Sequence, residues 1–214
     1  MKTMAVFGGS GGLGTELIPL LKKKYKVIAP KSREVDITIL SQVRIFFNTN
    51  DIDIVLNLTG KKHEVYLGEV EISDLHPIMD LFSVNLMGNI NILSACLPKM
   101  AEKEYGRVIA ISSIFAELNT PRNGIYSASK AFLDRLMGVA NRENIKHGIT
   151  CNTIQLGYWG VGMCDQIAEP YRSIAKEKIG LKRWGHGTEL YNTIRYIIEN
   201  EYVCGTNLRI DGGL

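Results

Sequence analysis

The sequence has no long hydrophobic run and no large block of like charge. No apolar run in its 214 residues approaches the roughly eighteen residues of a membrane-spanning helix. Only four apolar residues, from Met4 to Phe7, precede the first glycines, which is too few for the hydrophobic core of a secretory signal. The formal net charge of +3 is too small to indicate nucleic acid as the main partner. We therefore expect a cytoplasmic protein that binds neither membranes nor nucleic acids.

The sequence also lacks the cysteine and histidine spacings of a metal site. Its four cysteines, Cys96, Cys151, Cys164 and Cys204, are widely separated and form no Cys-x-x-Cys pair. Such a pattern is typical of free, reduced thiols in a cytoplasmic protein. The four histidines have no metal-ligand spacing either, so we predict no metal site.

Short runs rich in valine and isoleucine alternate with longer segments of helical period. The strand candidates are 4–7, 26–29, 54–58, 107–111, 149–156 and 207–210, and the helix candidates are 12–24, 38–48, 74–103, 125–146 and 187–200. This order predicts an α/β fold, a doubly wound parallel sheet with helices on both faces. Because no repeat or linker divides the chain, we expect one domain over 1–214. The irregular segment 157–186 is predicted to be a substrate lid.

A glycine-rich loop connects the first strand to the first helix. Glycines at this place let the backbone approach the pyrophosphate of a dinucleotide, and the helix N-terminus supplies N–H donors. The predicted cofactor-binding residues of this loop are Gly8, Ser10, Gly11, Gly12, Leu13 and Gly14. A flexible loop is the alternative explanation of such a string. Pro19 lies inside the helix that follows and predicts a kink there.

Basic residues follow the second strand, where an NAD enzyme usually offers an acid to the ribose 2′-hydroxyl. Lys31 and Arg33 would instead pair with the 2′-phosphate of NADP. We therefore predict NADP(H) as the preferred cofactor over NAD(H). A solvated turn is the alternative, and the neighbouring Glu34 favours it.

Tyr126 and Lys130 are four residues apart in a predicted helix, which places the phenol and the ammonium on one helical face. A cation about 4 Å from a phenolate stabilises it by up to roughly 4 kcal/mol at an effective dielectric constant near 20. Such a contact lowers the pKa of a tyrosine towards neutrality, where it acts as a general acid or base. On spacing alone, an ordinary pair on a helix surface is the commoner explanation.

The surrounding motifs resemble those of the short-chain dehydrogenase/reductase family over nearly the whole chain. The matches are Gly8, Gly12 and Gly14 of its TGxxxGxG loop, Asn57-Leu58-Thr59-Gly60 in place of NNAG, Val84-Asn85 in the helix of its active-site asparagine, and Asp211-Gly212-Gly213 in place of a C-terminal DGG. Ser113 lies thirteen residues before Tyr126 and fits the catalytic serine better than Ser112 does. The resemblance implies a Rossmann sheet of about seven parallel strands.

The resemblance also implies a reaction, in which hydride passes between NADPH and a carbonyl or alcohol substrate. Tyr126 would exchange the proton, and Ser113 would hydrogen-bond the reacting oxygen. Lys130 would bind the nicotinamide ribose and lower the pKa of Tyr126, with Asn85 in support. The further cofactor-binding residues that it implies are Asp36, Asn57, Thr59, Gly60, Tyr126, Lys130 and Gly157. Asp36 is equally well explained as a helix-capping residue.

The sequence departs from the family pattern at several places. Phe7 replaces the threonine of the glycine motif, Leu156 replaces a proline, and Val161 replaces a threonine that often holds the nicotinamide amide. The stretch from the second strand to Asp36 is also short. We expect the usual second helix and third strand to be largely deleted there.

Several alternatives to a single-domain reductase remain. Gly8, Gly11 and Gly14 also fit the TGxxGxxG loop of the family's extended branch, whose members modify sugar nucleotides and add a C-terminal domain. A sugar-nucleotide reductase or epimerase, a dinucleotide-sensing protein and a scaffold subunit are the other candidates. The helices near 74–103 and 125–146 resemble those that pair across a two-fold axis in the family, which implies a homodimer or homotetramer.

Overall fold

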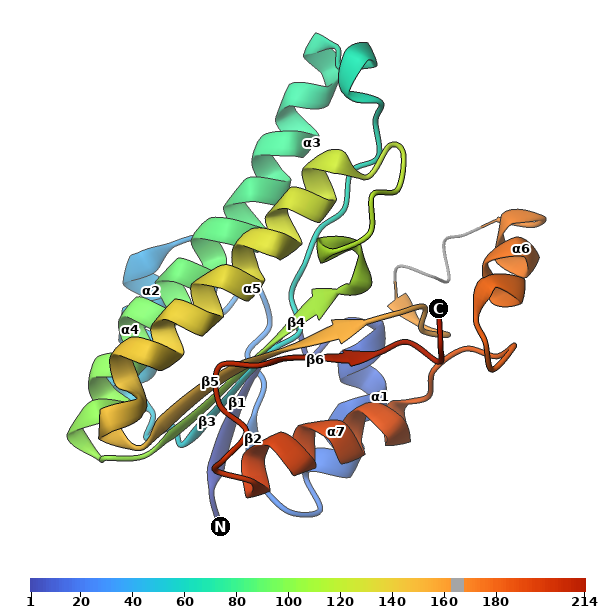
Figure 1. Cartoon of the computed structure of the whole chain (residues 1–214). Helices are drawn as coiled ribbons and strands as arrows, with labels where there is room; N and C mark the ends of the chain where they lie inside the picture. The colour runs from blue at the N-terminus through green and yellow to red at the C-terminus, as the bar shows by residue number, and fades with distance from the viewer. Residues whose placement is uncertain (163–167) are drawn as a thin grey trace.

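The structure is a computed structural model that describes residues 1–162 and 168–214. At its centre the described chain forms a parallel sheet of six strands in the order β2-β1-β3-β4-β5-β6 (Figure 1). The strands are β1 Thr3–Phe7, β2 Lys26–Ile28, β3 Ile54–Asn57, β4 Gly106–Ser113, β5 Ile149–Leu156 and β6 Asn207–Ile210. Each strand predicted from the sequence is present, so the Rossmann-like α/β fold is confirmed.

Helices cover both faces of this sheet. They are α1 Gly12–Leu21, α2 Leu40–Thr49, α3 Ile72–Phe82, α4 Gly88–Glu102, α5 Gly124–Asn144, α6 Tyr171–Lys178 and α7 Gly187–Glu199. In Figure 1, α2, α4 and α5 lie on one side of the sheet and α1 and α7 on the other. The helices predicted from the sequence are all present, and α1 continues past Pro19. The short helix α6, within the predicted lid, was not predicted.

The side chains of β1 show how the sheet is buried on both faces. Ala5 and Phe7 belong to the core under α2, α4 and α5, whereas Met4 and Val6 belong to the core under α1 and α7. This alternation follows from the two-residue period of a strand. Phe7 packs against the ring of Phe46 with 5.4 Å between the centroids. The departure from the family threonine at this position therefore fills the hydrophobic core.

The strand number implied by the family resemblance is one too high. The described sheet has six strands, and β1 pairs with β2 on one side and with β3 on the other. The connection between Ile28 and Leu40 is too short to hold both a helix and a strand. The predicted shortening after the second strand is thus present, and it leaves β2 at the edge.

A π-helical turn interrupts the longest predicted helix. The segment predicted over 74–103 consists of α3, a π-turn at Ser83–Met87 and α4. Such turns are frequent at functional sites, and Asn85 lies at the centre of this one. By length and composition Ile72–Glu102 could cross a membrane, but half of its most apolar window is buried inside the protein. It is accordingly explained as a core helix of the layer that covers the sheet.

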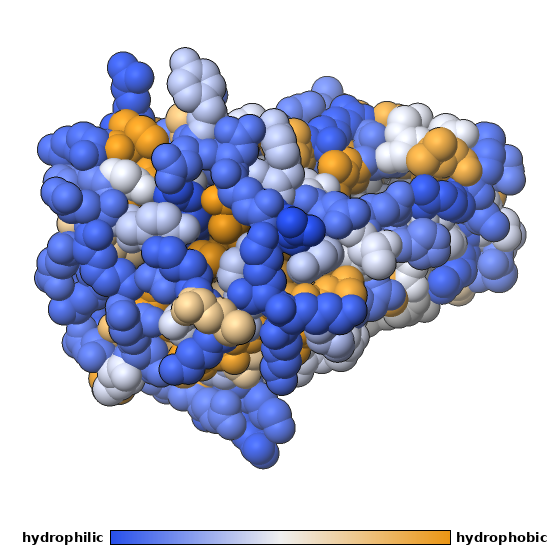
Figure 2. Space-filling view, turned by 90° about the horizontal axis from the view of Figure 1, so that it is seen from below, coloured by the Kyte–Doolittle hydropathy of each residue, from blue (hydrophilic) through white to orange (hydrophobic). Residues whose placement is uncertain are grey.

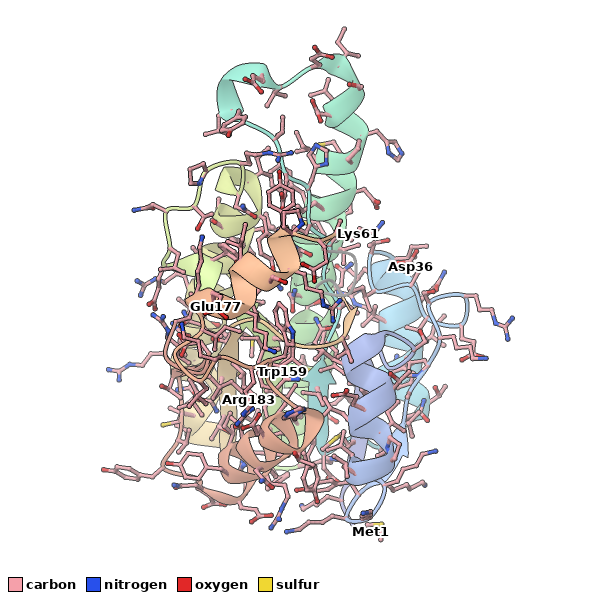
Figure 3. All side chains as sticks on the ribbon, turned by 90° about the vertical axis from the view of Figure 1, so that its right-hand side faces the viewer. Met1, Asp36, Lys61, Trp159, Glu177 and Arg183 are labelled. Atoms are coloured by element: carbon pink, nitrogen blue, oxygen red, sulfur yellow. The ribbon has the colours of Figure 1, made fainter. Side chains whose placement is uncertain are left out.

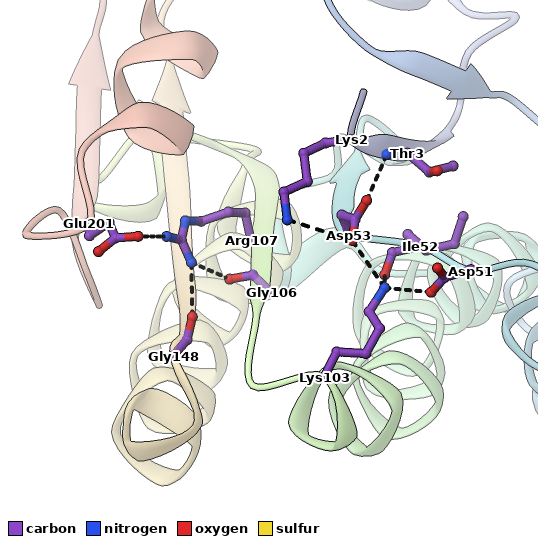
Figure 4. A network of polar contacts seen from close by, with 10 residues as sticks. All are labelled: Lys2, Thr3, Asp51, Ile52, Asp53, Lys103, Gly106, Arg107, Gly148 and Glu201. Atoms are coloured by element: carbon purple, nitrogen blue, oxygen red, sulfur yellow. Dashed lines mark hydrogen bonds and ion pairs between the residues drawn. The ribbon is translucent and has the colours of Figure 1, made fainter.

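Polar contacts connect the strands at the amino-terminal edge of the sheet (Figure 4). Asp53 accepts hydrogen bonds from the backbone N–H of Thr3 at 2.8 Å and from Lys103 Nζ at 3.1 Å. The buried guanidinium of Arg107 donates to two backbone carbonyls at 2.9 Å each and pairs with Glu201 at 2.9 Å. These contacts satisfy buried charges with protein partners, which identifies this edge as structural.

Hydrophobic side chains are distributed unevenly over the surface. The face seen from below is mostly hydrophilic, and its hydrophobic residues form small separate groups (Figure 2). On α3, by contrast, Ile72, Leu75 and Met79 are all exposed, with spacings of three and four residues. They therefore follow one side of that helix.

Candidate active site

The predicted site residues lie mainly at the carboxyl ends of the strands. Gly8 follows β1, Asn57 ends β3, Ser113 ends β4 and Gly157 follows β5. Figure 3 shows Asp36 and Lys61, which come after β2 and β3, far from Met1 at the opposite edge of the sheet. Because ligands of parallel α/β sheets bind beyond the carboxyl ends of the strands, this edge is the candidate site.

The glycine loop has the close backbone packing of a phosphate cradle. Gly8 has a φ of +79°, and a Cβ there would lie 3.0 Å from the carbonyl carbon of Leu58. A Cβ on Gly14 would overlap the carbonyl group of Gly9. The N-cap of α1 is Gly11, which provides no side-chain cap, so the first N–H groups of the helix are available to an anion. The loop therefore fits the pyrophosphate of a dinucleotide.

The remaining loop residues differ in their surroundings. Ser10 is exposed at the tip, whereas Leu13 packs against the core under α1 and α7. A Cβ on Gly12 would overlap the backbone nitrogen of Gly162. Val161 packs against the same core as Leu13. The segment after β5 thus lies directly against the glycine loop.

The turn after β2 presents its basic residues to solvent. Lys31 and Arg33 are exposed, and in the described part of the chain neither side chain forms an ion pair. Glu34 accepts the backbone N–H of Lys31 at 2.9 Å, so its carboxylate is directed to the turn itself. Asp36 accepts the N–H of Thr38 at 2.9 Å and its hydroxyl at 2.7 Å. It holds the turn before α2, whose N-cap is Ile39.

A series of amide side chains connects β3 to the helix of Tyr126. Asn57 accepts the hydroxyl of Thr59 at 2.7 Å and donates to Asn89 Oδ1 at 2.8 Å. Asn89 in turn donates to the backbone carbonyl of Asn85 at 2.8 Å. The amide of Asn85 donates to Ser129 Oγ at 3.0 Å, next to Lys130 in the chain. In this structure Asn57 and Thr59 shape the loop that continues into Gly60, and Asn85 contacts α5 through Ser129.

The helix α5 brings Tyr126 and Lys130 together in the interior. Both are buried, and Lys130 Nζ lies 5.9 Å from the centroid of the Tyr126 ring. Lys130 Nζ also donates to the carbonyl oxygen of Ile111 at 2.8 Å. This contact holds the ammonium against β4. The pair is therefore part of the interior and not a surface pair.

Burial changes the acid–base properties of Lys130. Removal from water lowers the pKa of its ammonium from 10.5 to about 8, although the nearby charge of Asp134 raises it. Asp134 is itself buried, and accepts hydrogen bonds from Thr153 and Gln155 at 2.8 Å each. Near neutral pH the ammonium remains mostly protonated, because the pH lies below this pKa.

The two serines at the end of β4 have different partners. Ser112 Oγ lies 3.5 Å from the backbone carbonyl oxygen of Lys130 and is thus directed to α5. Ser113 Oγ accepts the backbone N–H of Phe115 at 3.2 Å. Among the described contacts the hydroxyl proton of Ser113 has no acceptor, so it can be donated to a substrate oxygen. This arrangement favours Ser113 over Ser112.

Aromatic rings extend from Tyr126 towards the predicted lid. The ring of Phe115 lies 6.1 Å from that of Tyr126 and 6.4 Å from that of Tyr158, and Tyr158 lies 5.8 Å from Trp184. Sequence reasoning missed Phe115 and Trp184 as site residues. Phe115 could have been identified from the sequence, because it lies only two residues after Ser113.

The predicted lid residues are divided between core and surface. Trp159 is buried and forms an isolated bridge with Gly185, whereas Tyr171 is exposed. Met163 and Cys164, which belong to the same predicted lid segment, lie outside the described residues. Trp159 is thus a packing residue that attaches the beginning of this segment to its end.

Close packing against the C-terminal segment requires glycine at position 157. A Cβ there would lie 2.7 Å from the Cα of Asp211, and its N–H donates to the carbonyl of Ile210 at 3.0 Å. The C-terminal Asp-Gly-Gly motif therefore packs directly beneath the loop after β5. Glycine is needed at 157 for this contact, whatever else the residue binds.

The described residues contain no cluster of three or more histidine, cysteine or acidic side chains that could hold a metal ion. Cys96 and Cys151 are buried free thiols, and Cys204 is an exposed one. Cys164 lies outside the described residues.

Comparisons with known proteins match the chain over most or all of its length. The family model described as enoyl-(acyl carrier protein) reductase matches residues 21–214. Carbonyl reductase family member 4 of Xenopus laevis is 28% identical over an alignment of 236 residues, which covers 100% of this chain and 98% of that protein. The 3-oxoacyl-(acyl-carrier-protein) reductase FabG of Rickettsia typhi is 26% identical over 235 residues, covering 100% and 96%.

A solved structure, described as "ElxO with NADP Bound", has a TM-score of 0.87 to this chain. It covers 100% of this chain and 98% of its own, at 20% sequence identity. At that identity the likeness establishes the fold.

Proposed function

Because the chain belongs to the short-chain dehydrogenase/reductase family and is a nicotinamide-dependent oxidoreductase, we propose that it reduces a carbonyl substrate with NADPH, using Tyr126 as the proton donor. The observation that carries this proposal is the burial of Ser113, Tyr126 and Lys130 near the carboxyl end of β4, at the sheet edge that also carries the uncapped glycine loop. The reverse reaction, oxidation of an alcohol, would use the same residues.

The proposed roles follow from the contacts of each side chain. The glycine loop from Gly8 to Gly14 would hold the pyrophosphate, and the bound cofactor supplies the hydride. Tyr126 donates its phenolic proton to the substrate oxygen, and Ser113 donates a hydrogen bond to the same oxygen. The ammonium of Lys130 has three N–H donors, of which one bonds Ile111 among the described contacts, so it can also bind a ribose hydroxyl.

Asn85 is a positioning residue in this scheme. Its amide bonds both the backbone of Lys61 and the hydroxyl of Ser129, so it fixes α5 relative to the loop after β3. The remaining cofactor residues proposed are Asp36, Asn57, Thr59, Gly60 and Gly157. Their described contacts mainly shape the loops around the cofactor.

The preference for NADP is supported by the turn after β2. Lys31 and Arg33 are exposed there, and the carboxylate of Glu34 is used by the turn backbone. A 2′-phosphate would therefore meet two cations, while the one carboxylate of the turn is hydrogen-bonded to the backbone of Lys31. The solved structure described with NADP bound supports NADP as a cofactor.

We also propose that the whole chain is one catalytic domain that assembles into a homodimer or homotetramer. The relatives it matches from end to end are described as reductases of carbonyl or oxoacyl groups, which supports the single-domain branch over the sugar-nucleotide alternative. Exposed apolar residues on the α3–α5 layer, such as Met79 and Val139, provide a surface for self-association.

The test is a panel of aldehydes and ketones, with the loss of NADPH or NADH absorbance as the readout. We expect turnover with NADPH and a higher kcat/KM than with NADH. The variant Tyr126→Phe should lose at least about a hundredfold in kcat while binding NADPH with unchanged affinity, measured by cofactor fluorescence. Retained turnover in this variant would refute the role of Tyr126.

A further inference from the structure

A second lysine, Lys62, lies beside the proposed proton donor. The backbone that carries it is fixed, because the amide of Asn85 bonds both the N–H and the carbonyl of Lys61, at 2.8 and 2.9 Å. Lys62 Nζ lies 5.3 Å from the centroid of the Phe115 ring and 5.8 Å from that of Tyr126. The ammonium of Lys62 thus lies beside two aromatic rings of the site, and Asn85 holds the backbone of the residue before it.

The two lysines near Tyr126 have different environments. Lys130 is buried and bonded to β4, at the base of the site. The Lys62 side chain is 28% exposed and therefore in contact with solvent. Lys62 is therefore a cation that contacts solvent and also lies near the ring of Tyr126.

The described partners of Lys62 can be exchanged for a ligand. Its one ion pair among the described residues is with Glu64, whose side chain is 40% exposed. Exposed ion pairs contribute only about 0–1 kcal/mol, and a cation over an aromatic ring contributes about the same. The side chain of the adjacent Lys61 is directed to α3, where it pairs with Asp80.

We propose that Lys62 binds a carboxylate on the substrate, and that the substrates of this enzyme are therefore oxo acids. The carbonyl lies at Ser113 and Tyr126, the carboxylate replaces Glu64 at Lys62, and the ring of Phe115 contacts the carbon chain between them. This inference rests on the proposed carbonyl reduction and specifies its substrate class. Lys62 is a specificity-determining residue in it.

The test compares free acids with their methyl esters, which have the same carbonyl but no charge. Suitable probes are 3-oxobutanoic, 4-oxopentanoic and 4-formylbenzoic acids, which differ in the separation of carbonyl and carboxylate. We expect the wild-type enzyme to have a kcat/KM about fivefold higher for at least one acid than for its ester, because an ion pair at a partly exposed lysine contributes up to about 1 kcal/mol. The difference should lie mainly in KM.

Variants of the neighbouring residues make the test specific. Lys62→Met should reduce the acid-to-ester ratio to about one, whereas the control Lys61→Met, which removes the same charge one residue away, should keep the wild-type ratio. Glu64→Gln should raise the ratio, because it removes the competing carboxylate. A wild-type ratio near one for all three pairs, or an unchanged ratio in Lys62→Met, would overturn the inference while leaving carbonyl reduction intact. Absence of turnover with every acid and ester would instead refute the proposed function.

Discussion

Replacement of Lys130 by methionine should remove a rise in the stability of the fold between about pH 8 and pH 10.5. Burial lowers the pKa of this ammonium from 10.5 to about 8. That difference corresponds to about 3 kcal/mol of unfavourable free energy while both folded and unfolded chains are protonated. At pH values between about 8 and 10.5, Lys130 has released its proton in the folded chain and still binds it in the unfolded chain. Stability therefore rises with pH in this window for the wild type, and the methionine variant lacks this contribution.

The measurement is urea unfolding of both proteins, without cofactor, at intervals from about pH 7 to about pH 10. We expect the wild type to gain about 2–3 kcal/mol relative to Lys130→Met over that range, because other titrating groups cancel in the difference. Loss of the bond to Ile111 adds a constant and does not alter the slope. The matched control is Lys99→Met, since that side chain is 47% exposed and folding leaves it in water. A constant difference between wild type and Lys130→Met would refute the stated burial cost.

Two further predictions concern other parts of the molecule. Replacing both Lys31 and Arg33 by alanine should lower the ratio of kcat/KM for NADPH to that for NADH by at least about tenfold, because each cation would supply a charge-assisted contact to the 2′-phosphate. An unchanged ratio in steady-state assays would show that the turn does not select the cofactor. Arg107→Met should destabilise the fold by about 3 kcal/mol in urea unfolding, because it leaves buried carbonyls unpaired at the amino-terminal edge of the sheet. Turnover per folded molecule should persist in Arg107→Met, and a selective loss of kcat would contradict the structural assignment of that edge.

The strands were predictable because each carries its own signal. The segment Ile149–Leu156 is buried at every position, as expected for a parallel strand covered on both faces, and its predicted bounds match the structure. The helix α6 was not predictable in the same way. It is only eight residues long and mostly polar, and it buries only Ala175, so few apolar positions mark it as a helix. The strand number was overestimated because it was taken from the family and not from the chain.

The sequence predicted which residues form the candidate site but not how deeply each side chain is buried or what it contacts. Spacing places Tyr126 and Lys130 on one face of a helix, yet the burial of Lys130 depends on how α5 packs against β4. The two lysines at 61 and 62 look equivalent in sequence. Tertiary packing directs one to Asp80 and the other to the aromatic rings of the site.

The shortened connection after β2 bears on how such a protein can evolve. Residues 31–34 are all exposed, and they follow an edge strand of only three residues. Substitutions in this turn therefore disturb no core packing and carry little risk to folding. A lineage with this connection could exchange one nicotinamide dinucleotide for the other through neutral drift of a few surface positions, without first acquiring a more stable scaffold.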